Sequence, residues 1–369
     1  MNAARQPVTI LGAGKIGLAM ALLLQRCPDY EVRVADRNPQ RLEALAGIGC
    51  ETVCLDVASD TELTDAIAGR FAVLNALPFH RAVAVAQLAA RQGVHYFDLT
   101  EDVKSTQAIQ ALAQTAGTVL MPQCGLAPGF IGIVGHDLAT RFDELLDLHM
   151  RVGALPRFPV NALRYNLTWS TEGLINQYCN PCEAIVEGQI AEVQALAGRE
   201  TFALDGIQYE AFNTSGGLGT LTRTLHGRAR NVDYKSVRYP GHGEIMALLL
   251  NELRLRERPD LLKEILERAV PSTEQDVIVI LATASGHRGG RLMQDSYSAR
   301  IIGTHVDGHL LSAIQFTTAA GICAVLDLVR EGHLPQAGFI SQEQVSLPVF
   351  LGNRFGRAFA EGSLENVQA

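Results

Sequence analysis

Short apolar runs alternate with longer, helix-forming segments over the first third of the chain. The runs are rich in Val, Leu, Ile and aromatic residues, and the segments between them are long enough for crossover helices. Runs that are apolar on both faces and alternate with helices indicate a parallel sheet covered on both sides. Right-handed crossovers then predict an α/β fold with a doubly wound sheet. The predicted strands are residues 8–11, 32–35, 52–55, 72–77, 96–99 and 118–121, and the predicted helices are residues 16–26, 39–46, 60–68, 79–92 and 104–115.

From about residue 147 the pattern changes to apolar and polar residues in alternation, with few helices. This period of two predicts a mixed or antiparallel sheet with one buried face. A long apolar helix over residues 311–330 is expected to pack back on the first domain together with the tail. The predicted strands here are residues 148–152, 162–168, 184–195, 277–284 and 291–302, and the predicted helices are residues 174–178, 245–256 and 260–269.

These patterns predict two interleaved domains with a cleft between them. Residues 1–127 and 312–369 form the first, and residues 128–311 form an inserted α+β domain for substrate binding and dimerisation. The length of 369 residues suits two domains, and 47% apolar with 19% charged residues is a globular balance. The net charge of −8 argues against nucleic acid as a partner.

Cysteine usage and the start of the chain bear on its compartment. Seven dispersed cysteines are typical of reduced thiols in a cytoplasm. The first residues have no signal-peptide pattern, and we find no run of 18 apolar residues. We therefore expect a cytoplasmic protein without a membrane partner.

The sequence GAGKIG over residues 12–17 is the strongest local signal. It follows a predicted strand and opens a predicted helix. Gly12 allows a tight turn, Gly14 lets the backbone approach a pyrophosphate, and Gly17 lets the helix sit close to the strand. Lys15 and Ile16 begin the helix, whose free N–H groups face the anion. This turn predicts a dinucleotide-binding Rossmann domain.

The end of the second predicted strand bears on the choice of cofactor. Asp36 lies where a carboxylate accepts hydrogen bonds from the adenosine ribose, which favours NAD. The next residue, Arg37, is suited to a 2′-phosphate, so NADP is the alternative.

Other strand ends fall at the same edge of the predicted sheet, where ligands bind in open α/β folds. Asn75, Leu77 and Pro78 follow the fourth strand and Gly125 follows the sixth, and we expect them to line the ribose and nicotinamide. Asp98 ends the fifth strand, where it either caps a helix or contacts substrate.

Several polar and glycine-rich strings in the second domain exceed what core packing requires. They are TWSTEGLINQY at 168–178, FNTSGG at 212–217 and YKSVRYPGH at 234–242. Together with YFDL at 96–99 and CGLAPGF at 124–130, they resemble the saccharopine dehydrogenase family, especially its short lysine 6-dehydrogenase-like branch. The resemblance implies NAD(P)-linked oxidation at an amine-bearing carbon of lysine or a lysine-derived amino acid. It leaves open whether the substrate is lysine itself or a secondary amine such as saccharopine.

This chemistry needs a base for the ammonium proton and fixed charges for the amino-acid end. Arg238 is the first choice for the substrate carboxylate, although exposed arginines often form only surface ion pairs. His242 is a candidate base or a hydrogen-bonded structural histidine. Glu172 is a candidate base or ammonium partner, or a helix cap.

The remaining candidates come from the same strings. Trp169, Thr171, Tyr178 and Tyr239 are candidates for the substrate wall, with core packing as the alternative. The CNPC string at 179–182 has no second cysteine pair or spaced histidine pair, so we expect no metal.

The sequence thus predicts an NAD-dependent amine dehydrogenase, a homodimer by family analogy. Its alternatives are a saccharopine-type secondary-amine dehydrogenase using NADP, and a non-catalytic NAD(P)-binding sensor.

Overall fold

In the computed structural model, which describes residues 5–360, the contacts between residues divide the chain into two units. Unit 1 comprises Met1–Phe130, His305–His309 and Gln315–Ala358, and unit 2 comprises Ile131–Thr304, Leu310–Ile314 and Phe359–Ala369. The sequence analysis expected domain boundaries after residues 127 and 311, and these boundaries stay a prediction.

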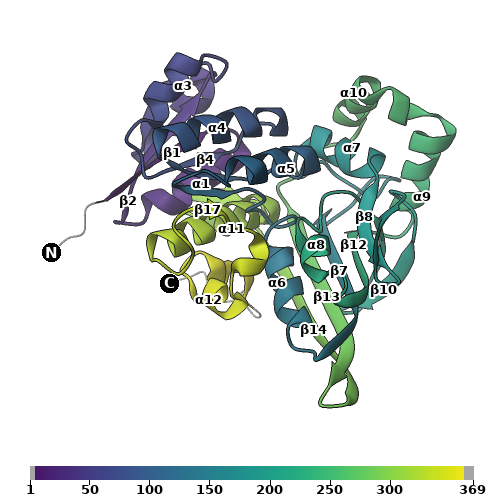
Figure 1. The fold of residues 1–369 in the computed structure, drawn as a ribbon. Helices are drawn as coiled ribbons and strands as arrows, with labels where there is room; N and C mark the ends of the chain where they lie inside the picture. Colours follow the sequence, from purple (N-terminus) through teal and green to yellow (C-terminus); the bar gives the residue numbers. More distant parts are fainter. Residues whose placement is uncertain (1–4, 361–369) are drawn as a thin grey trace. The chain divides into compact units, whose positions relative to one another are not determined.

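Unit 1 is built on a seven-stranded sheet in the order β17-β6-β5-β4-β1-β2-β3, and the strand pairs in it are parallel (Figure 1). This order, with helices between the strands, confirms the predicted doubly wound fold. The strands are β1 (Gln6–Leu11), β2 (Tyr30–Asp36), β3 (Glu51–Cys54), β4 (Ala72–Asn75), β5 (His95–Asp98), β6 (Val119–Met121) and β17 (Gly338–Phe339). The helices are α1 (Lys15–Gln25), α2 (Pro39–Glu43), α3 (Asp60–Ile67), α4 (Ala82–Gln92), α5 (Val103–Leu112), α11 (Ala313–Arg330) and α12 (Leu347–Gly352).

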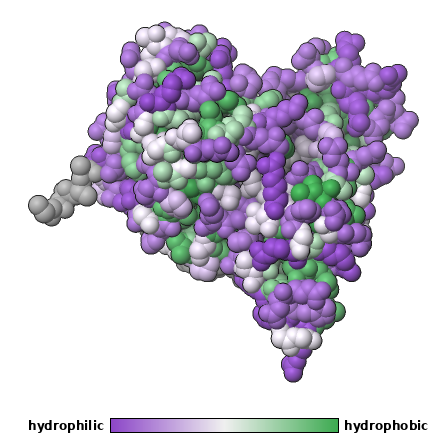
Figure 2. Space-filling view, viewed as in Figure 1, coloured by the Kyte–Doolittle hydropathy of each residue, from purple (hydrophilic) through white to green (hydrophobic). Residues whose placement is uncertain are grey.

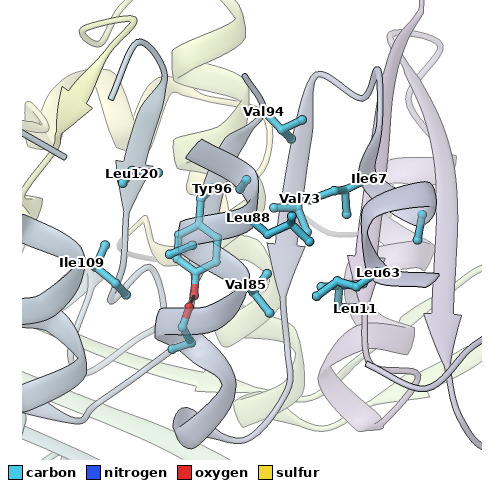
Figure 3. Packing of buried hydrophobic residues seen from close by; sticks show 14 of the residues in the cluster. Leu11, Leu63, Ile67, Val73, Val85, Leu88, Val94, Tyr96, Ile109 and Leu120 are labelled. Atoms are coloured by element: carbon cyan, nitrogen blue, oxygen red, sulfur yellow. Dashed lines mark hydrogen bonds between the residues drawn. The ribbon is translucent and has the colours of Figure 1, made fainter. Parts of the chain in front are cut away.

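One face of this sheet carries an apolar cluster beneath α3, α4 and α5 (Figure 3). Leu11, Val73, Tyr96 and Leu120 come from four strands and point to the same face, because side chains alternate along a strand. All four are buried. At about 25 cal/mol per Å² of apolar surface, this burial is the main driving force for assembling the unit.

The opposite face packs against α1 and α11. Ile10 lies on this face, and a Cβ added at Gly17 of α1 would come within 3.7 Å of its side chain. Tyr30 of β2 points to the same face as Ile10, because it lies an even number of residues from Val34, the register partner of Ile10. Its hydroxyl donates a hydrogen bond to Asp327 of α11 at 2.7 Å. The C-terminal part of the chain thus returns to unit 1, where β17 pairs with β6.

Helix α11 is apolar and long enough to cross a membrane by length and composition, which the sequence analysis did not expect. Of its most apolar window, 83% is buried inside the fold, as in any core helix. In Figure 2, the apolar residues that reach the visible surface form separate patches among polar ones.

Unit 2 is built on a mixed sheet, as predicted. Its main order is β10-β11-β12-β7-β13-β14; β12 and β7 are parallel, the other neighbours in this order are antiparallel, and the β8–β9 hairpin pairs with β12. The strands are β7 (Glu144–Pro156), β8 (Cys182–Val186), β9 (Gln189–Val193), β10 (Glu200–Leu204), β11 (Ile207–Asn213), β12 (Ala229–Arg238), β13 (Asp276–Arg288) and β14 (Arg291–Ile302). The helices are α6 (Phe130–Ala139), α7 (Thr171–Cys179), α8 (Leu221–Leu225), α9 (His242–Ala247) and α10 (Pro259–Ala269).

Three predicted elements of unit 2 are wrong. The single strand predicted over 184–195 is the antiparallel hairpin of β8 and β9, because a turn at Glu187 and Gly188 interrupts it. Residues 162–168 form a loop with one bridge, from Leu167 to Ser272, because their alternation reflects burial against α7 and not strand pairing. The helix predicted over 245–256 is broken into α9, a π-helical turn at Leu248–Glu252 and a 3₁₀ turn at Leu255–Glu257. The sequence analysis also missed α6, β10, β11 and β12.

A buried carboxylate ties the end of α11 to the rest of unit 1. Asp327 is fully buried and accepts hydrogen bonds from Tyr30, from Asn353 at 2.8 Å and from Arg354 at 2.7 Å. Burial opposes its charge, but the hydrogen bonds from Arg354, Tyr30 and Asn353 lower the pKa of Asp327. The ionised carboxylate therefore stabilises the fold above the pKa of the unfolded chain, and this contribution is lost as the pH falls.

We predict that Asp327→Ala lowers the free energy of unfolding by about 3–5 kcal/mol at pH 7, because it leaves the partly buried guanidinium groups of Arg330 and Arg354 and the buried donors of Tyr30 and Asn353 without their acceptor. Asp137→Ala is the control, since it removes only a partly exposed pair with Arg141 and should cost about 0–1 kcal/mol. Urea denaturation of both variants checks this. Equal losses would contradict the assignment.

Candidate functional site

The glycine turn between β1 and α1 has the geometry that its sequence predicts. Gly12 has φ +102°, a backbone conformation that residues with a Cβ rarely adopt. A Cβ at Gly17 would lie 1.8 Å from the carbonyl oxygen of Gly12, so only glycine lets α1 pack this closely. A Cβ at Gly14 would meet no atom within 4 Å. Open space therefore lies beside the backbone at the position where a pyrophosphate would approach.

The start of α1 completes an anion site. Gly14 is the N-cap residue and supplies no side-chain hydrogen bond to the helix. Within the described part of the chain, the N–H groups of Lys15, Ile16 and Gly17 have no hydrogen-bond acceptor, and the helix ladder begins with Leu18 donating to Gly14 at 2.9 Å. Free N–H groups and the positive end of the helix dipole suit a phosphate. These residues fit a dinucleotide.

Asp36 at the end of β2 is held by the main chain of the same region. Its Oδ2 accepts a hydrogen bond from the N–H of Ala13 at 2.7 Å, and its Oδ1 accepts one from Asn38 at 2.8 Å. The residue is buried, whereas Arg37 is exposed and the guanidinium of Arg41 lies 3.9 Å from the carboxylate. Asp36 therefore fixes the glycine turn, and the guanidinium of Arg41 lies near it.

We predict different outcomes for two alanine substitutions in this turn. Gly17→Ala should lower the free energy of unfolding by about 1–3 kcal/mol, because α1 must move off β1. Gly14→Ala should leave stability within about 0.5 kcal/mol. It should still weaken dinucleotide binding by about tenfold or more, because the methyl group enters the space for the pyrophosphate. Urea denaturation and cofactor titration measure the two effects, and a Gly14→Ala variant that binds normally would contradict this placement.

Asp98 at the end of β5 is a latch between strand ends. Its Oδ1 accepts hydrogen bonds from the N–H groups of Thr100 at 2.9 Å and Gln123 at 3.0 Å. Its Oδ2 accepts one from the hydroxyl of Tyr96 at 2.6 Å, and Asn75 donates to that hydroxyl at 3.1 Å. Asp98 thus holds the loops after β5 and β6, and the N-cap residue of the following helix α5 is Asp102 instead. Asp98 is 1% exposed, so the structure gives it no surface for substrate.

The other predicted residues of this edge lie on either side of that latch. Asn75 is buried and accepts a hydrogen bond from the N–H of Leu77 at 3.1 Å. Leu77 in turn lies beside Gly12, and Pro78 is exposed. Gly125 follows β6 and is buried. Asn75 thus orients the β4 end towards the glycine turn, and Leu77 and Pro78 remain available to a ligand.

Burial raises the pKa of Asp98 to about 6, while its hydrogen bonds oppose the shift. The folded state therefore holds more protons than the unfolded chain between about pH 4 and pH 6. For this group, the free energy of unfolding falls as the pH rises through that window.

We predict that Asp98→Asn stays within about 1 kcal/mol of the parent at pH 7, because the amide oxygen accepts from the same two N–H groups. Asp98→Leu should lose about 1–3 kcal/mol for each of these buried donors. Asp98→Asn should also lack the fall in stability between about pH 4 and pH 6. Denaturation at several pH values tests this, and equal losses for Asn and Leu would refute the latch.

In unit 2, three of the predicted residues meet. Arg238 at the end of β12 donates from Nε to the hydroxyl of Tyr178 at 2.8 Å. That hydroxyl lies 3.0 Å from Nε2 of His242. The guanidinium carbon also lies 5.1 Å from the ring centre of Tyr165 and 5.7 Å from that of Tyr178. Burial first, then the nearby Arg238 charge, lowers the pKa of His242 to about 3.

The buried Arg238 has no carboxylate within ion-pair distance in the described part of the chain. Glu210 is its neighbour across β11 and β12. The oxygens of Glu210, however, accept hydrogen bonds from the N–H groups of Gly241 at 2.9 Å and Gly243 at 2.6 Å. Taking a cation out of water is costly unless an anion or acceptors satisfy it. The charge of Arg238 is therefore not neutralised by a carboxylate of the described residues.

The other predicted residues of unit 2 do not join this cluster. Glu172 is mostly exposed and pairs with Lys263 of α10, so it faces solvent at the start of α7. Tyr239 lies on the other face of β12 and donates to the carbonyl of Pro156 at 3.0 Å. Trp169 packs against the apolar cluster below α7, and Thr171 is the buried first residue of that helix.

Sequence reasoning missed Tyr165 and Phe212 as site residues. Tyr165 is 1% exposed, and its hydroxyl has no hydrogen-bond partner. Phe212 stacks on His242 with an interplanar angle of 4°. Phe212 stood in a singled-out string, but Tyr165 lies in the misassigned strand and had no local signal. No group of three or more potential metal-binding side chains occurs among residues 5–360, and Cys179 and Cys182 are free thiols.

The turn, the parallel sheet and the mixed-sheet unit define the class of two-part dinucleotide-binding α/β proteins. A family model described as the saccharopine dehydrogenase NADP binding domain matches residues 8–121, and one described as the saccharopine dehydrogenase C-terminal domain matches residues 125–352. The chain belongs to the saccharopine dehydrogenase family, which confirms the resemblance.

Relatives of known name agree. Saccharopine dehydrogenase (NADP(+), L-glutamate-forming) of Pyricularia oryzae is 23% identical over 278 residues, covering 70% of this chain and 59% of that protein. The mitochondrial alpha-aminoadipic semialdehyde synthase of Bos taurus is 25% identical over 211 residues, covering 53% and 22%. The chain thus spans less than two thirds of the length of these relatives. An apo saccharopine dehydrogenase (L-Glu forming) from Saccharomyces cerevisiae shares the fold, with TM-score 0.77, 18% identity and coverage of 94% and 96%.

Proposed function

We propose that this protein is an NAD(P)-dependent oxidoreductase that oxidises an amine-bearing carbon of lysine or a lysine-derived amino acid. The observation that carries the substrate class is the buried Arg238, which has no carboxylate partner of its own. Its planar guanidinium suits the carboxylate of an amino acid. Family membership supports the redox chemistry. The relative from Pyricularia oryzae is named as a saccharopine dehydrogenase.

NADP is the proposed cofactor, in place of the NAD favoured by the sequence. That preference depended on Asp36 reading the ribose, but this carboxylate is buried and is turned to the N–H groups of Ala13 and Asn38. Arg41 supplies a cation beside it, and the exposed Arg37 follows it in the chain; guanidinium groups suit a 2′-phosphate. The match to an NADP-binding family model agrees.

When bound, the cofactor would supply the hydride acceptor through its nicotinamide, and the glycine turn with the start of α1 would hold its pyrophosphate. Arg238 would hold the amino-acid end of the substrate. This contact would orient the amine-bearing carbon for hydride transfer. The amine must lose a proton before hydride transfer. Both ring nitrogens of His242 are engaged, and Asp98 is sealed, so neither is placed to take that proton. Of Asp98, Glu172 and His242, Glu172 is the most exposed, and it pairs with Lys263.

The two amine chemistries of the family differ in substrate. Lysine 6-dehydrogenase chemistry acts on a primary amine, and saccharopine-type chemistry acts on a secondary amine that carries further carboxylates. One isolated cation, Arg238, supports the capture of one carboxylate and is compatible with both.

We predict turnover when the protein is mixed with NADP and either L-lysine or saccharopine, followed by the absorbance of the reduced cofactor. NAD should be used less well than NADP. The substrate that reacts distinguishes the two chemistries. Absence of turnover with both cofactors and both amino acids would contradict the enzymatic proposal and favour the sensor alternative.

Arg238→Gln should lower kcat/KM for the reacting amino acid by about 100-fold, the value of one charged contact of about 2–3 kcal/mol. For an amine of the same chain length that lacks the carboxylate, kcat/KM should be the same for Arg238→Gln and for the parent. Arg254→Gln makes the same change at an arginine whose side chain is 72% exposed and serves as the matched control. Equal effects of both substitutions would refute the assignment of Arg238.

A further inference from the structure

The hydrogen bonds around Arg238 leave one edge of its guanidinium free. Nε donates to Tyr178, and Nη1 donates to the carbonyl of Val237 at 2.7 Å. Nη2 has no acceptor among the described residues. Arg238 is 3% exposed, so the unused Nη2 donor lies within the fold, where it is costly unless a ligand supplies an acceptor. Its orientation therefore depends on the Nε edge.

Chemistry fixes the direction of the hydrogen bonds along this edge. A guanidinium only donates, so the hydroxyl oxygen of Tyr178 accepts from Nε. The hydroxyl proton is then directed to His242, whose Nε2 must carry a lone pair. The other ring nitrogen, Nδ1, lies 3.0 Å from the carbonyl of Leu163, which only accepts. Both ends of the chain thus require the same tautomer, with the proton on Nδ1.

The surroundings hold that tautomer in place. His242 and Tyr178 are both 0% exposed, and the imidazole stacks on Phe212. The charged group nearest to the ring is Arg238, which together with burial keeps the pKa of His242 near 3. Glu210 also acts on Tyr178, but its oxygens cap α9. The imidazole is therefore neutral over the range in which enzymes work, and the direction of the chain does not reverse.

The ring of Tyr165, next to the guanidinium, carries a second unpaired polar atom. The hydroxyl of Tyr165 is buried without a partner, which is costly unless a ligand completes it. Its ring lies against Arg238, and the pKa of Arg238 is raised, against burial, by Tyr178 and Tyr165. A carboxylate at Nη2 would offer this hydroxyl an acceptor.

We infer that Tyr178 and His242 are positioning residues: a one-way hydrogen-bond chain from Arg238 through Tyr178 and His242 to the carbonyl of Leu163 fixes the guanidinium to receive a substrate carboxylate, with Tyr165 as its second donor. This inference rests on the proposed function, because it deepens the role of Arg238. His242, which the sequence analysis considered as a candidate base, would instead act indirectly by orienting Tyr178.

The test uses the full chain with NADPH bound and L-norleucine as the probe. Norleucine has the chain length and carboxylate of lysine but cannot be oxidised at its end. Calorimetry should show about tenfold weaker binding for Tyr178→Phe and His242→Phe, which both keep an aromatic ring, or about 1.4 kcal/mol. His242→Gln should recover most of the affinity, because its amide oxygen accepts from Tyr178.

Tyr239→Phe is the matched control, since its hydroxyl lies on the other face of β12. It should bind norleucine like the parent, and all variants should bind NADPH equally. Nitrogen-15 spectra of labelled histidine should show His242 protonated on Nδ1 alone at neutral pH, with the resonance assigned by its loss in His242→Phe.

The outcomes separate the two proposals. If Arg238→Gln weakens norleucine binding but Tyr178→Phe and His242→Phe do not, the positioning chain is refuted and the carboxylate site stands. If the parent does not bind norleucine, or Arg238→Gln binds it equally, the carboxylate site itself is refuted. A proton on Nε2 of His242 overturns the chain independently of any ligand.

Discussion

The hydrogen bond from Nε of Arg238 to the hydroxyl of Tyr178 holds a positive charge inside unit 2. The charge is tolerated because the faces of two tyrosine rings lie against it, although no carboxylate neutralises it. Glu210 is paired with Arg238 in the strand register, but its oxygens accept hydrogen bonds from the N–H groups of Gly241 and Gly243 at the start of α9. The charge of the guanidinium is therefore not neutralised by Glu210, and this is the basis of the proposed carboxylate site.

Carboxylates at strand ends have a different role in unit 1. Asp36 and Asp98 both accept main-chain N–H groups from a loop that borders the ligand edge of the sheet. Each thereby converts a flexible strand end into a fixed surface, since a buried N–H without an acceptor is unfavourable. These two carboxylates, which the sequence presented as candidate ligand contacts, thus bind the main chain of the loops.

The predictions that succeeded depended on local rules. The glycine turn requires residues without a Cβ at Gly12 and Gly17, and the short apolar runs match the strands of unit 1 closely. Those that failed depended on neighbours far along the chain. Residues 162–168 alternate like a strand but find no partner strand, and Tyr165 is made a site residue only by Arg238, which lies on β12.

The sequence by itself determined the doubly wound unit, the dinucleotide turn and the family, because these are encoded by spacing within short segments. Only the tertiary structure decided what each polar side chain does. His242 and Asp98 have ordinary titrating side chains in the sequence, and burial together with fixed hydrogen-bond partners removes them from direct chemistry. The function of a polar group depends on which donors and acceptors surround it, and distant strands and loops supply those.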